Sequence, residues 1–169
     1  MNPNTPHAGN PIVQQVTNNA TGWVGHHPGQ NKDIARGQTF VAATEADVNA
    51  IEVYSNIVSQ PGNVMMTIHS FDPQKNSWGP SLGSANVDMK KSDSGKWIAF
   101  NIPPLHLDKG KSYGFRLESQ DCYIGVGEAA GSAKQPPFSA GQEWQFTPNN
   151  QKGDAYSYFS LAFKVGKKS

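Results

Sequence analysis

The stretch from Lys96 to Ser119 constrains the fold of this chain more than any other segment. Its large apolar residues stand two positions apart on either side of a turn, at Ile98, Phe100, Ile102, Tyr113, Phe115 and Leu117. A period of two places each set on one face of a pleated β strand. Asp108-Lys109-Gly110 supplies the reversal, because Asp caps turns and Gly adopts a positive φ without strain. The stretch therefore predicts a β hairpin whose inward face belongs to the core.

The same alternation continues along most of the chain, with turn residues between the apolar segments. Further strands are predicted at residues 12–17, 36–43, 47–58, 64–68, 82–90, 122–126, 142–146 and 156–165. No segment shows a sustained helical period of 3.6 residues. Many short strands separated by turns are typical of antiparallel proteins built from two packed sheets. We therefore predict an all-β fold, an antiparallel two-sheet sandwich of the jelly-roll type.

The length of 169 residues fits a single domain. Residues 1–11 contain three prolines and little to bury, so we expect a flexible lead-in followed by one β-sandwich domain over residues 12–169. If one face of each strand is buried, the core is formed by Phe40, Ile51, Val53, Val64, Met66, Ile68, Ile98, Phe100, Tyr113, Phe115, Leu117, Leu161 and Phe163. The sequence shows no second core and no internal repeat.

Charge and hydropathy exclude two classes of partner. The net charge is +1, and the only arginines are Arg36 and Arg116. The one cluster of cations, at Lys164, Lys167 and Lys168, is interpreted as a solubilising C-terminal end and not as a site for nucleic-acid phosphates. No run approaches the ~20 apolar residues needed to span a bilayer, so we predict no membrane insertion. Cys122 is the only cysteine and has no partner for an internal disulfide. The sequence does not indicate an oligomeric state.

The order of these strand and turn signals resembles a broad group of bacterial extracellular jelly-roll modules. The matching pieces are GQTF (Gly37–Phe40), IEVY (Ile51–Tyr54), PGNV (Pro61–Val64), the segment Trp97–Leu117 and SLAF (Ser160–Phe163). They resemble the galactose-binding-like sandwiches and carbohydrate-binding modules of secreted or surface proteins. The resemblance implies an extracellular, periplasmic or cell-surface location and carbohydrate binding. It also implies a structural calcium, although no D-x-D-x-D run or acidic cluster identifies ligands for it, and no other cofactor is expected.

Aromatic residues outside the alternating faces are the candidates for a binding site. Sugar rings stack their apolar faces on Trp and Tyr, while amides, carboxylates and Arg form hydrogen bonds with their hydroxyl groups. Trp23 and Trp78 are predicted to lie in loops, and Trp144 follows the longest loop. The predicted ligand-binding residues are Trp23, His26, His27, Trp78, Glu128, Glu143 and Trp144. The alternative for each tryptophan is that it packs against an end of the sandwich.

Possible catalytic patterns lack the context that their chemistry needs. Ser81 lies in GPSLG, but no buried strand precedes it and no helix is predicted after it. Cys122 follows Asp121, whose charge disfavours a thiolate. Glu128 and Glu143 form a glycosidase pair only if their carboxyl groups lie ~5–9.5 Å apart, which the sequence cannot establish. We therefore predict no catalytic residues.

His26 and His27 do not by themselves predict a metal site. Adjacent side chains on an extended backbone point to opposite sides, and no Cys or third His is near in sequence. We therefore predict a non-catalytic carbohydrate-binding module of a secreted or surface protein. The alternative is a structural or protein-interaction accessory domain without a small-molecule ligand.

Overall fold

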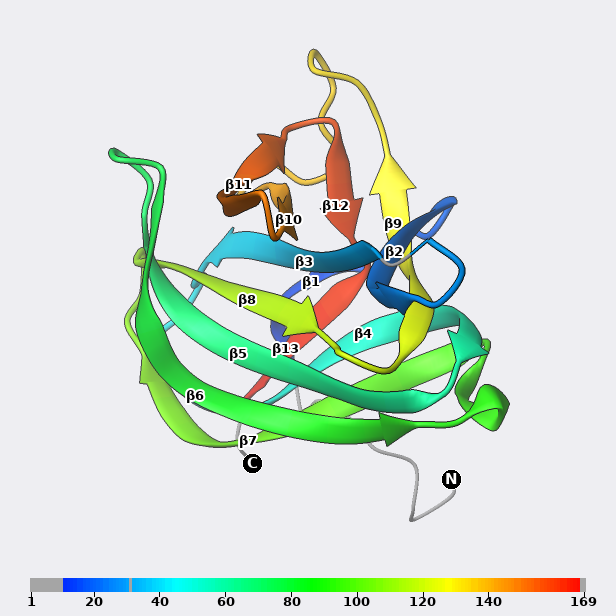
Figure 1. Cartoon of the computed structure of the whole chain (residues 1–169). Helices are drawn as coiled ribbons and strands as arrows, with labels where there is room; N and C mark the ends of the chain where they lie inside the picture. The colour runs from blue at the N-terminus through cyan, green and yellow to red at the C-terminus, as the bar shows by residue number, and fades with distance from the viewer. Residues whose placement is uncertain (1–10, 31, 168–169) are drawn as a thin grey trace.

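The computed structural model describes residues 11–30 and 32–167, which form thirteen β strands and one short 3-10 turn (Figure 1). The strands are β1 (Pro11–Gln15), β2 (Ala20–His27), β3 (Lys32–Val41), β4 (Ala46–Gln60), β5 (Gly62–Asp72), β6 (Ser77–Met89), β7 (Lys96–Leu107), β8 (Ser112–Glu118), β9 (Tyr123–Ala130), β10 (Glu143–Thr147), β11 (Asn150–Tyr156), β12 (Phe159–Leu161) and β13 (Phe163–Lys167), and the turn η1 spans Lys91–Asp93. Within these residues, no helix has the length and apolar character needed to cross a membrane.

All strand pairs are antiparallel, and the sheet is continuous along the order β1-β13-β4-β9-β2-β3-β8-β5-β6. Off this path, β7 pairs with β4, β12 pairs with β9, and the β10–β11 hairpin pairs with β3. The sheet curls into a half-barrel, in which β5, β6 and β8 lie in front of β4, β7 and β13 (Figure 1). The predicted all-β antiparallel fold is confirmed, although the two layers belong to one curled sheet.

β3 connects the two layers because its two ends pair with different strands. Ile34 lies opposite Gly25 of β2, whereas the segment from Arg36 to Val41 pairs with β8. Residues 35–38 also pair with β10 on the other edge of β3. This strand therefore sets the position of the β10–β11 hairpin relative to both layers.

The core lies between the two layers and contains every residue predicted for it. All thirteen of those side chains are at most 6% exposed. Phe163 of the rear layer packs against Phe115 and Phe40 of the front layer, with ring centroids 5.6 Å and 6.0 Å apart. Burying a large apolar side chain stabilises a fold by roughly 1.5–3 kcal/mol, so these contacts hold the layers together.

The predicted hairpin over Lys96–Ser119 is wrong, although its faces are right. β7 pairs with β4, whereas β8 pairs with β3 and β5. Gly110 has the expected positive φ of 81°, but its N–H donates to the carbonyl oxygen of Ala42 (2.8 Å) at the end of β3. The turn therefore carries the chain from one layer to the other, and both strands find their partners elsewhere.

Trp23 and Trp78 lie in strands, not in the loops that we predicted for them. The buried residues around Trp23 include Gly22 and Gly25. Because glycine has no side chain, these positions show no apolar alternation in the sequence. Gly79 and Pro80 likewise interrupt the apolar pattern of the strand that contains Trp78. Glycine and proline are read as turn signals in a sequence, so strands that contain them are missed.

Candidate functional site

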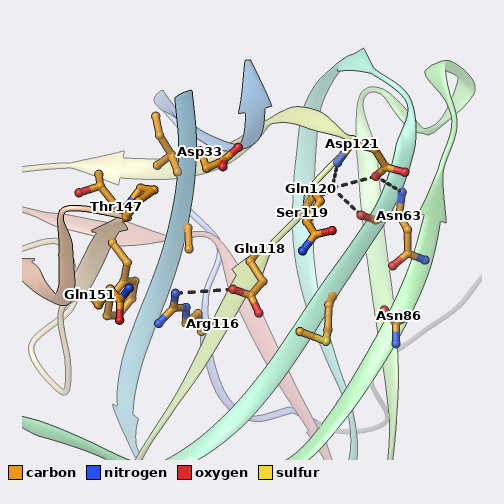
Figure 2. Close-up of a pocket in the computed structure, with 15 residues that line it drawn as sticks. Asp33, Asn63, Asn86, Arg116, Glu118, Ser119, Gln120, Asp121, Thr147 and Gln151 are labelled. Carbon is orange, nitrogen blue, oxygen red and sulfur yellow. Dashed lines mark hydrogen bonds and ion pairs between the residues drawn. The ribbon is translucent and has the colours of Figure 1, made fainter. Parts of the chain in front are cut away.

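The main cleft of the molecule has a volume of about 900 Å³ and opens on the outer face of the front layer (Figure 2). Its walls come from β3, β5, β6 and β8, from the turn after β8 and from the β10–β11 hairpin. It is lined by Asp33, Ile34, Ala35, Asn63, Met65, Asn86, Arg116, Glu118, Ser119, Gln120, Asp121, Phe146, Thr147, Pro148 and Gln151. Amide, carboxylate and hydroxyl groups thus converge from segments that are far apart in sequence.

The strand period that builds the core also presents these polar groups. On β8, Phe115 and Leu117 point into the core, so Arg116 and Glu118 point to the cleft. On the neighbouring strand β5, Met65 lies opposite Glu118. Each cleft residue on these strands is therefore placed by a buried neighbour in sequence.

Among the residues that the structure describes, Arg116 is the only cation that lines the cleft. Its guanidinium carbon lies 4.3 Å from the ring centroid of Phe146, and its Nη2 lies 3.5 Å from Oε2 of Glu118 (Figure 2). The side chain is 29% exposed, while its Nε atom is buried and has no hydrogen-bond partner among the described residues. Its Nε donor is thus buried without a partner among these residues, and the exposed part of the side chain faces the cleft. Because Asp33, Glu118 and Asp121 also line the cleft, carboxylates outnumber its one cation.

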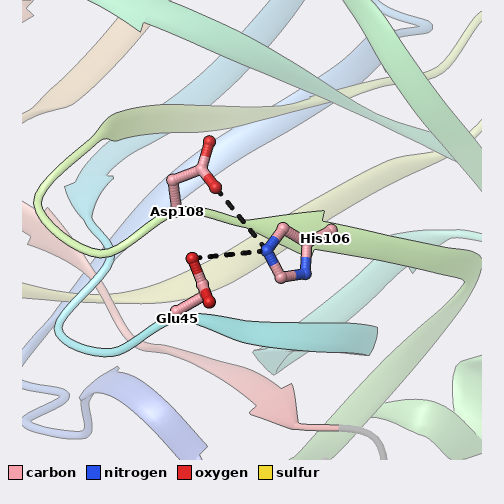
Figure 3. Close-up of side chains that lie close together, drawn as sticks. All are labelled: Glu45, His106 and Asp108. Atoms are coloured by element: carbon pink, nitrogen blue, oxygen red, sulfur yellow. Dashed lines mark ion pairs between the residues drawn. The ribbon is translucent and has the colours of Figure 1, made fainter.

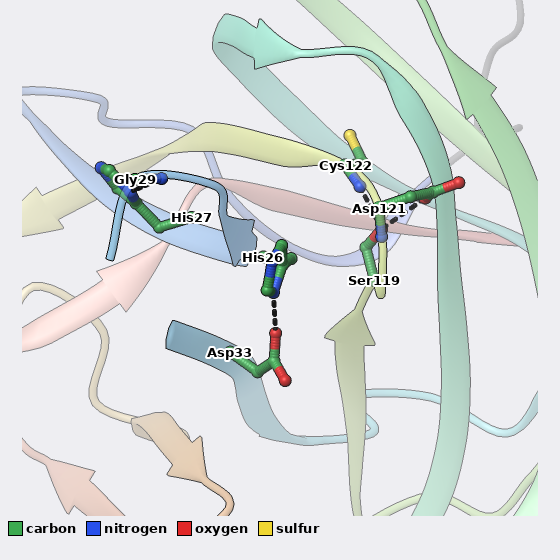
Figure 4. Close-up of polar contacts among 7 residues, drawn as sticks. All are labelled: His26, His27, Gly29, Asp33, Ser119, Asp121 and Cys122. Carbon is green, nitrogen blue, oxygen red and sulfur yellow. Dashed lines mark hydrogen bonds and ion pairs between the residues drawn. The ribbon is translucent and has the colours of Figure 1, made fainter. Parts of the chain in front are cut away.

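The rim beyond β8 is held by a network around Ser119 (Figures 2 and 4). The Ser119 hydroxyl donates to the carbonyl oxygen of Asn63 and accepts from the N–H of Cys122 at 2.8 Å. The N–H of Asn63 donates to Oδ1 of Asp121 at 3.0 Å. The two bonds of Asn63 join the start of β5 to the turn before β9, and the bond from Cys122 to Ser119 closes that turn, so the rim is ordered without any ligand.

The thiol of Cys122 is buried beneath this rim, and its surroundings disfavour the thiolate. Burial, together with the charge of Asp121, raises the pKa of the Cys122 thiol from 9.0 to about 11. The thiolate is the reactive form of cysteine. The expectation of an inert thiol therefore agrees with its surroundings.

Trp78 and Trp144 belong to an aromatic cluster with Phe71 and Phe146. The rings of Trp78 and Trp144 meet edge to face with centroids 5.8 Å apart, and Phe146 lies 5.5 Å and 6.2 Å from them. Trp144 follows the longest loop, as expected, but it is 3% exposed and offers no stacking surface to a ligand. The two tryptophans pack against Phe146, which lines the cleft and also contacts Arg116.

Trp23, His26 and His27 lie beside the cleft rather than in it. Trp23 stacks on Tyr123 with ring centroids 4.8 Å apart, and the ring of His27 contacts Tyr123 edge-on. His26 pairs through Nδ1 with Asp33, which lines the cleft, while Nδ1 of His27 accepts the N–H of Gly29 (Figure 4). The two histidines have separate partners, as expected for neighbours on a strand.

Glu128 and Glu143 form a buried cluster with Arg36, away from the residues that line the cleft. Nη1 of Arg36 donates to Oε2 of Glu143 at 2.8 Å, and its Nε donates to the carbonyl oxygen of Trp23. The two glutamates are 5% and 0% exposed, so they are not the surface groups that a ligand-binding role requires. They flank the longest loop, as predicted, but the pairing of β9 and β10 with other strands encloses them.

The surroundings of Glu143 favour its protonated form. Burial first, and then the neighbouring Glu128, raise the pKa of Glu143 to about 9, although Arg36 acts in the opposite direction. With both groups ionised, Oε1 of Glu143 and Oε2 of Glu128 are buried acceptors without a partner. A proton on one carboxyl group turns two acceptors into a donor and an acceptor. The net charge of the cluster, with Arg36 positive and one carboxylate negative, is then zero.

The cleft residues were missed because nothing in the linear sequence marks them. Arg116 and Glu118 are the outward residues of a strand whose inward residues we predicted correctly. This outward orientation is the one property of the two residues that the sequence predicts. Which outward residues line a cleft depends on the register between β8 and β5 and on the hairpin that β3 holds nearby. Neither can be derived from alternation alone.

Comparisons with known proteins identify a shared fold but no family. No family model and no curated protein matches the chain. Among solved structures, the chain is similar to a crystal structure that contains the cysteine protease and lectin-like domains of Cwp84, a surface layer associated protein of Clostridium difficile. The TM-score is 0.50, and the identity is 12% over 82% of this chain. The chain spans 33% of that protein.

A second structure of Cwp84, determined after propeptide cleavage, has a TM-score of 0.46, 13% identity and coverage of 81% of this chain and 37% of the other. The epithelial adhesin 6 A domain from Candida glabrata, solved in complex with Galb1-3GlcNAc, has a TM-score of 0.31 and 10% identity, with coverage of 94% and 72%. At such identities the likeness to the first structure concerns architecture alone. The chain therefore has a β-rich fold of the kind found in a polypeptide that carries a lectin-like domain.

Proposed function

We propose that this chain is a non-catalytic carbohydrate-binding module of a secreted or surface protein, and that its ligand occupies the cleft around Arg116. The observation that carries the proposal is the position of Arg116, a cation that lines a cleft together with amide, carboxylate and hydroxyl side chains. The fold shared with a surface-layer-associated protein supports it and favours an extracellular location.

The cleft offers the mixture of groups that recognise sugars. Hydroxyl groups of a sugar both donate and accept, so they pair well with amides, which do the same, and with carboxylates and arginine. Four amide side chains line the cleft, from Asn63, Asn86, Gln120 and Gln151. Met65 and Pro148 supply apolar surface for the C–H groups of a sugar ring.

The charge of the cleft favours a neutral glycan. Asp33, Glu118 and Asp121 are all carboxylates, and Glu118 already lies near the one guanidinium group. An acidic sugar would bring a further negative charge among these groups, which costs binding energy through like-charge repulsion. Uronic acids and sialic acid should therefore bind less well than neutral sugars of the same size.

The predicted roles of Trp23, His26 and His27 belong to the same proposal. His26 touches the cleft through Asp33, and the stacked pair of Trp23 and Tyr123 lies next to it on the adjoining strands β2 and β9. A glycan longer than the cleft would extend across this half-exposed aromatic pair. Trp78, Trp144, Glu128 and Glu143 would then act indirectly, by holding β10 and Phe146 in place.

The experiment is a glycan-array screen of the parent protein, followed by calorimetric titration of any ligand found. We expect Asn86→Ala to lower the affinity about tenfold, since it removes a side chain that lines the cleft. Asn101→Ala is the matched control, because Asn101 is an exposed asparagine on β7 and does not line the cleft. Absence of binding across diverse neutral glycans would contradict the proposal and favour a protein-interaction module.

A further inference from the structure

A second group of polar side chains lies where β4 and β7 meet, and it is separate from the cleft (Figure 3). Glu45 directly precedes β4, His106 lies near the end of β7, and Asp108 follows that strand. Asp47 on β4 is the cross-strand partner of His106. The pairing of β4 with β7 thus brings together residues that are about sixty positions apart in sequence.

The imidazole of His106 is oriented by Asp47. Nδ1 lies 2.8 Å from Oδ1 of Asp47, a hydrogen bond in which the ring nitrogen donates. Donation from Nδ1 leaves the lone pair of the neutral ring on Nε2. Nε2 points to the other two carboxylates, at 3.6 Å from Oε1 of Glu45 and 3.5 Å from Oδ1 of Asp108. A carboxylate that holds the far nitrogen of a histidine is the usual support of a metal-ligating imidazole.

The spacing of the three groups suits ligands of one small cation. One atom from each of His106, Glu45 and Asp108 lies within 4.8 Å of the others. The separations of 3.5 Å and 3.6 Å from Nε2 are longer than good hydrogen bonds. They match the edge of a tetrahedron around zinc, ~3.4 Å for ligands at ~2.0–2.2 Å from the metal. All three side chains are exposed, so the carboxylates can close the remaining gap by rotation.

We propose that His106, Glu45 and Asp108 bind a divalent transition-metal ion, with Zn²⁺ the best fit, while Asp47 orients the histidine. Zinc accepts one imidazole nitrogen and two carboxylate oxygens, with water in the fourth position. Calcium takes six to eight oxygen ligands and does not favour nitrogen, so this set disfavours it. The proposal names a different metal from the calcium implied by the sequence resemblance, and it does not depend on the carbohydrate function.

Binding would fasten the connection before β4 to the turn after β7. Glu45 and Asp108 both lie outside their strands, and the ion would join them through His106. A ligand that binds only the folded state raises its stability in proportion to the logarithm of its concentration. We expect a rise in Tm of about 5–10 °C at a Zn²⁺ concentration one hundred times Kd.

The test is calorimetric titration of chelator-treated full-length protein with ZnCl₂, CaCl₂ and MgCl₂ in separate runs. We expect one Zn²⁺ per chain, with Ca²⁺ and Mg²⁺ giving no saturable binding. His106→Ala should abolish the Zn²⁺ site, and Asp47→Ala should weaken it about 10–100-fold because the ring loses its orienting partner. His27→Ala is the matched control and should leave it unchanged, since His27 lies on β2 beside Tyr123.

The competing arrangement is an imidazolium held by the same three carboxylates without any metal. The hydrogen bond to Asp47 raises the pKa of His106, so the titration is done above neutral pH to remove this competition. Absence of Zn²⁺ binding there, or equal binding by His106→Ala, would overturn the proposal. Glu45→Gln provides a second variant at a loop position, so that a folding defect in His106→Ala does not decide the result. Its Zn²⁺ affinity should fall at least tenfold, and an unchanged affinity would also overturn the proposal.

Discussion

The chain has two arginines, and each lies beside a glutamate in a different kind of place. Arg36 is 11% exposed and contacts fully buried Glu143 at 2.8 Å, whereas Arg116 lies 3.5 Å from half-exposed Glu118 in the cleft. In the interior, charge must be paired because the surroundings cannot solvate it. At the surface, water screens a pair and leaves both partners available. The first pair is therefore structural, and the second is free to exchange its partner for a ligand.

Removing the buried arginine should have the largest effect on stability. Arg36→Ala leaves the carboxyl cluster of Glu128 and Glu143 without a cation, and breaking a buried pair in this way costs about 3–5 kcal/mol. Urea unfolding, monitored by tryptophan fluorescence, measures the decrease in the free energy of unfolding. Glu118→Ala, which breaks the exposed pair, is the control and should cost about 0–1 kcal/mol. Equal losses would remove the distinction between the two pairs.

The protonation of Glu143 makes the stability of the buried cluster depend on pH. The pKa of Glu143 rises from 4.5 to about 9 on folding, so between these values the folded chain holds a proton that the unfolded chain has released. The free energy of unfolding should therefore fall as pH rises from about 5 to 9, with a slope of up to about 1.4 kcal/mol per pH unit from this group. Urea unfolding at a series of pH values gives the slope.

Glu143→Gln sharpens the same measurement. The amide keeps an acceptor for Arg36 and supplies a permanent donor toward Glu128, so it replaces that proton. The fall in stability with rising pH should become shallower in this variant. An unchanged slope would show that the proton is held elsewhere.

Changing the exposed arginine should have the smallest effect on stability. Arg116→Ala removes a weak ion pair and a cation–π contact with Phe146, which together contribute on the order of 1 kcal/mol. Its affinity for a glycan should nevertheless fall about tenfold or more, because hydrogen bonds to charged groups contribute about 1.5–3 kcal/mol. Thermal unfolding and calorimetric titration of the same sample separate the two effects. A large loss of stability with unchanged affinity would reverse the roles assigned to the two arginines.

Prediction from the sequence succeeded where burial alone decides the outcome. Residues such as Phe115 and Phe163 stand at every second position of apolar strands, and this pattern has only one stable solution, with the apolar face inward. Prediction failed for the pairing between strands. The alternation in Lys96–Ser119 places each side chain on its face, but it cannot indicate that β7 joins β4 and that β8 lies between β3 and β5.

The candidate sites show the same division. Trp144 and Glu143 attracted interest as residue types, yet both are enclosed once β10 pairs with β3 and β11. Arg116 gave no signal of its own, because an outward arginine on a strand is usually only a solvated side chain. His106 and Asp47 become neighbours solely through the register of β7 against β4.

The sequence by itself determined the all-β class, the inward face of each apolar strand and the reversal at Gly110. These properties follow from the short-range geometry of a pleated strand and from the conformational freedom of glycine. The tertiary structure decided which strands pair, which charges are buried with Arg36 and which are left in the cleft with Arg116. Pairing between distant strands is a choice among many registers of similar local energy, and only the packing of the complete core selects one of them.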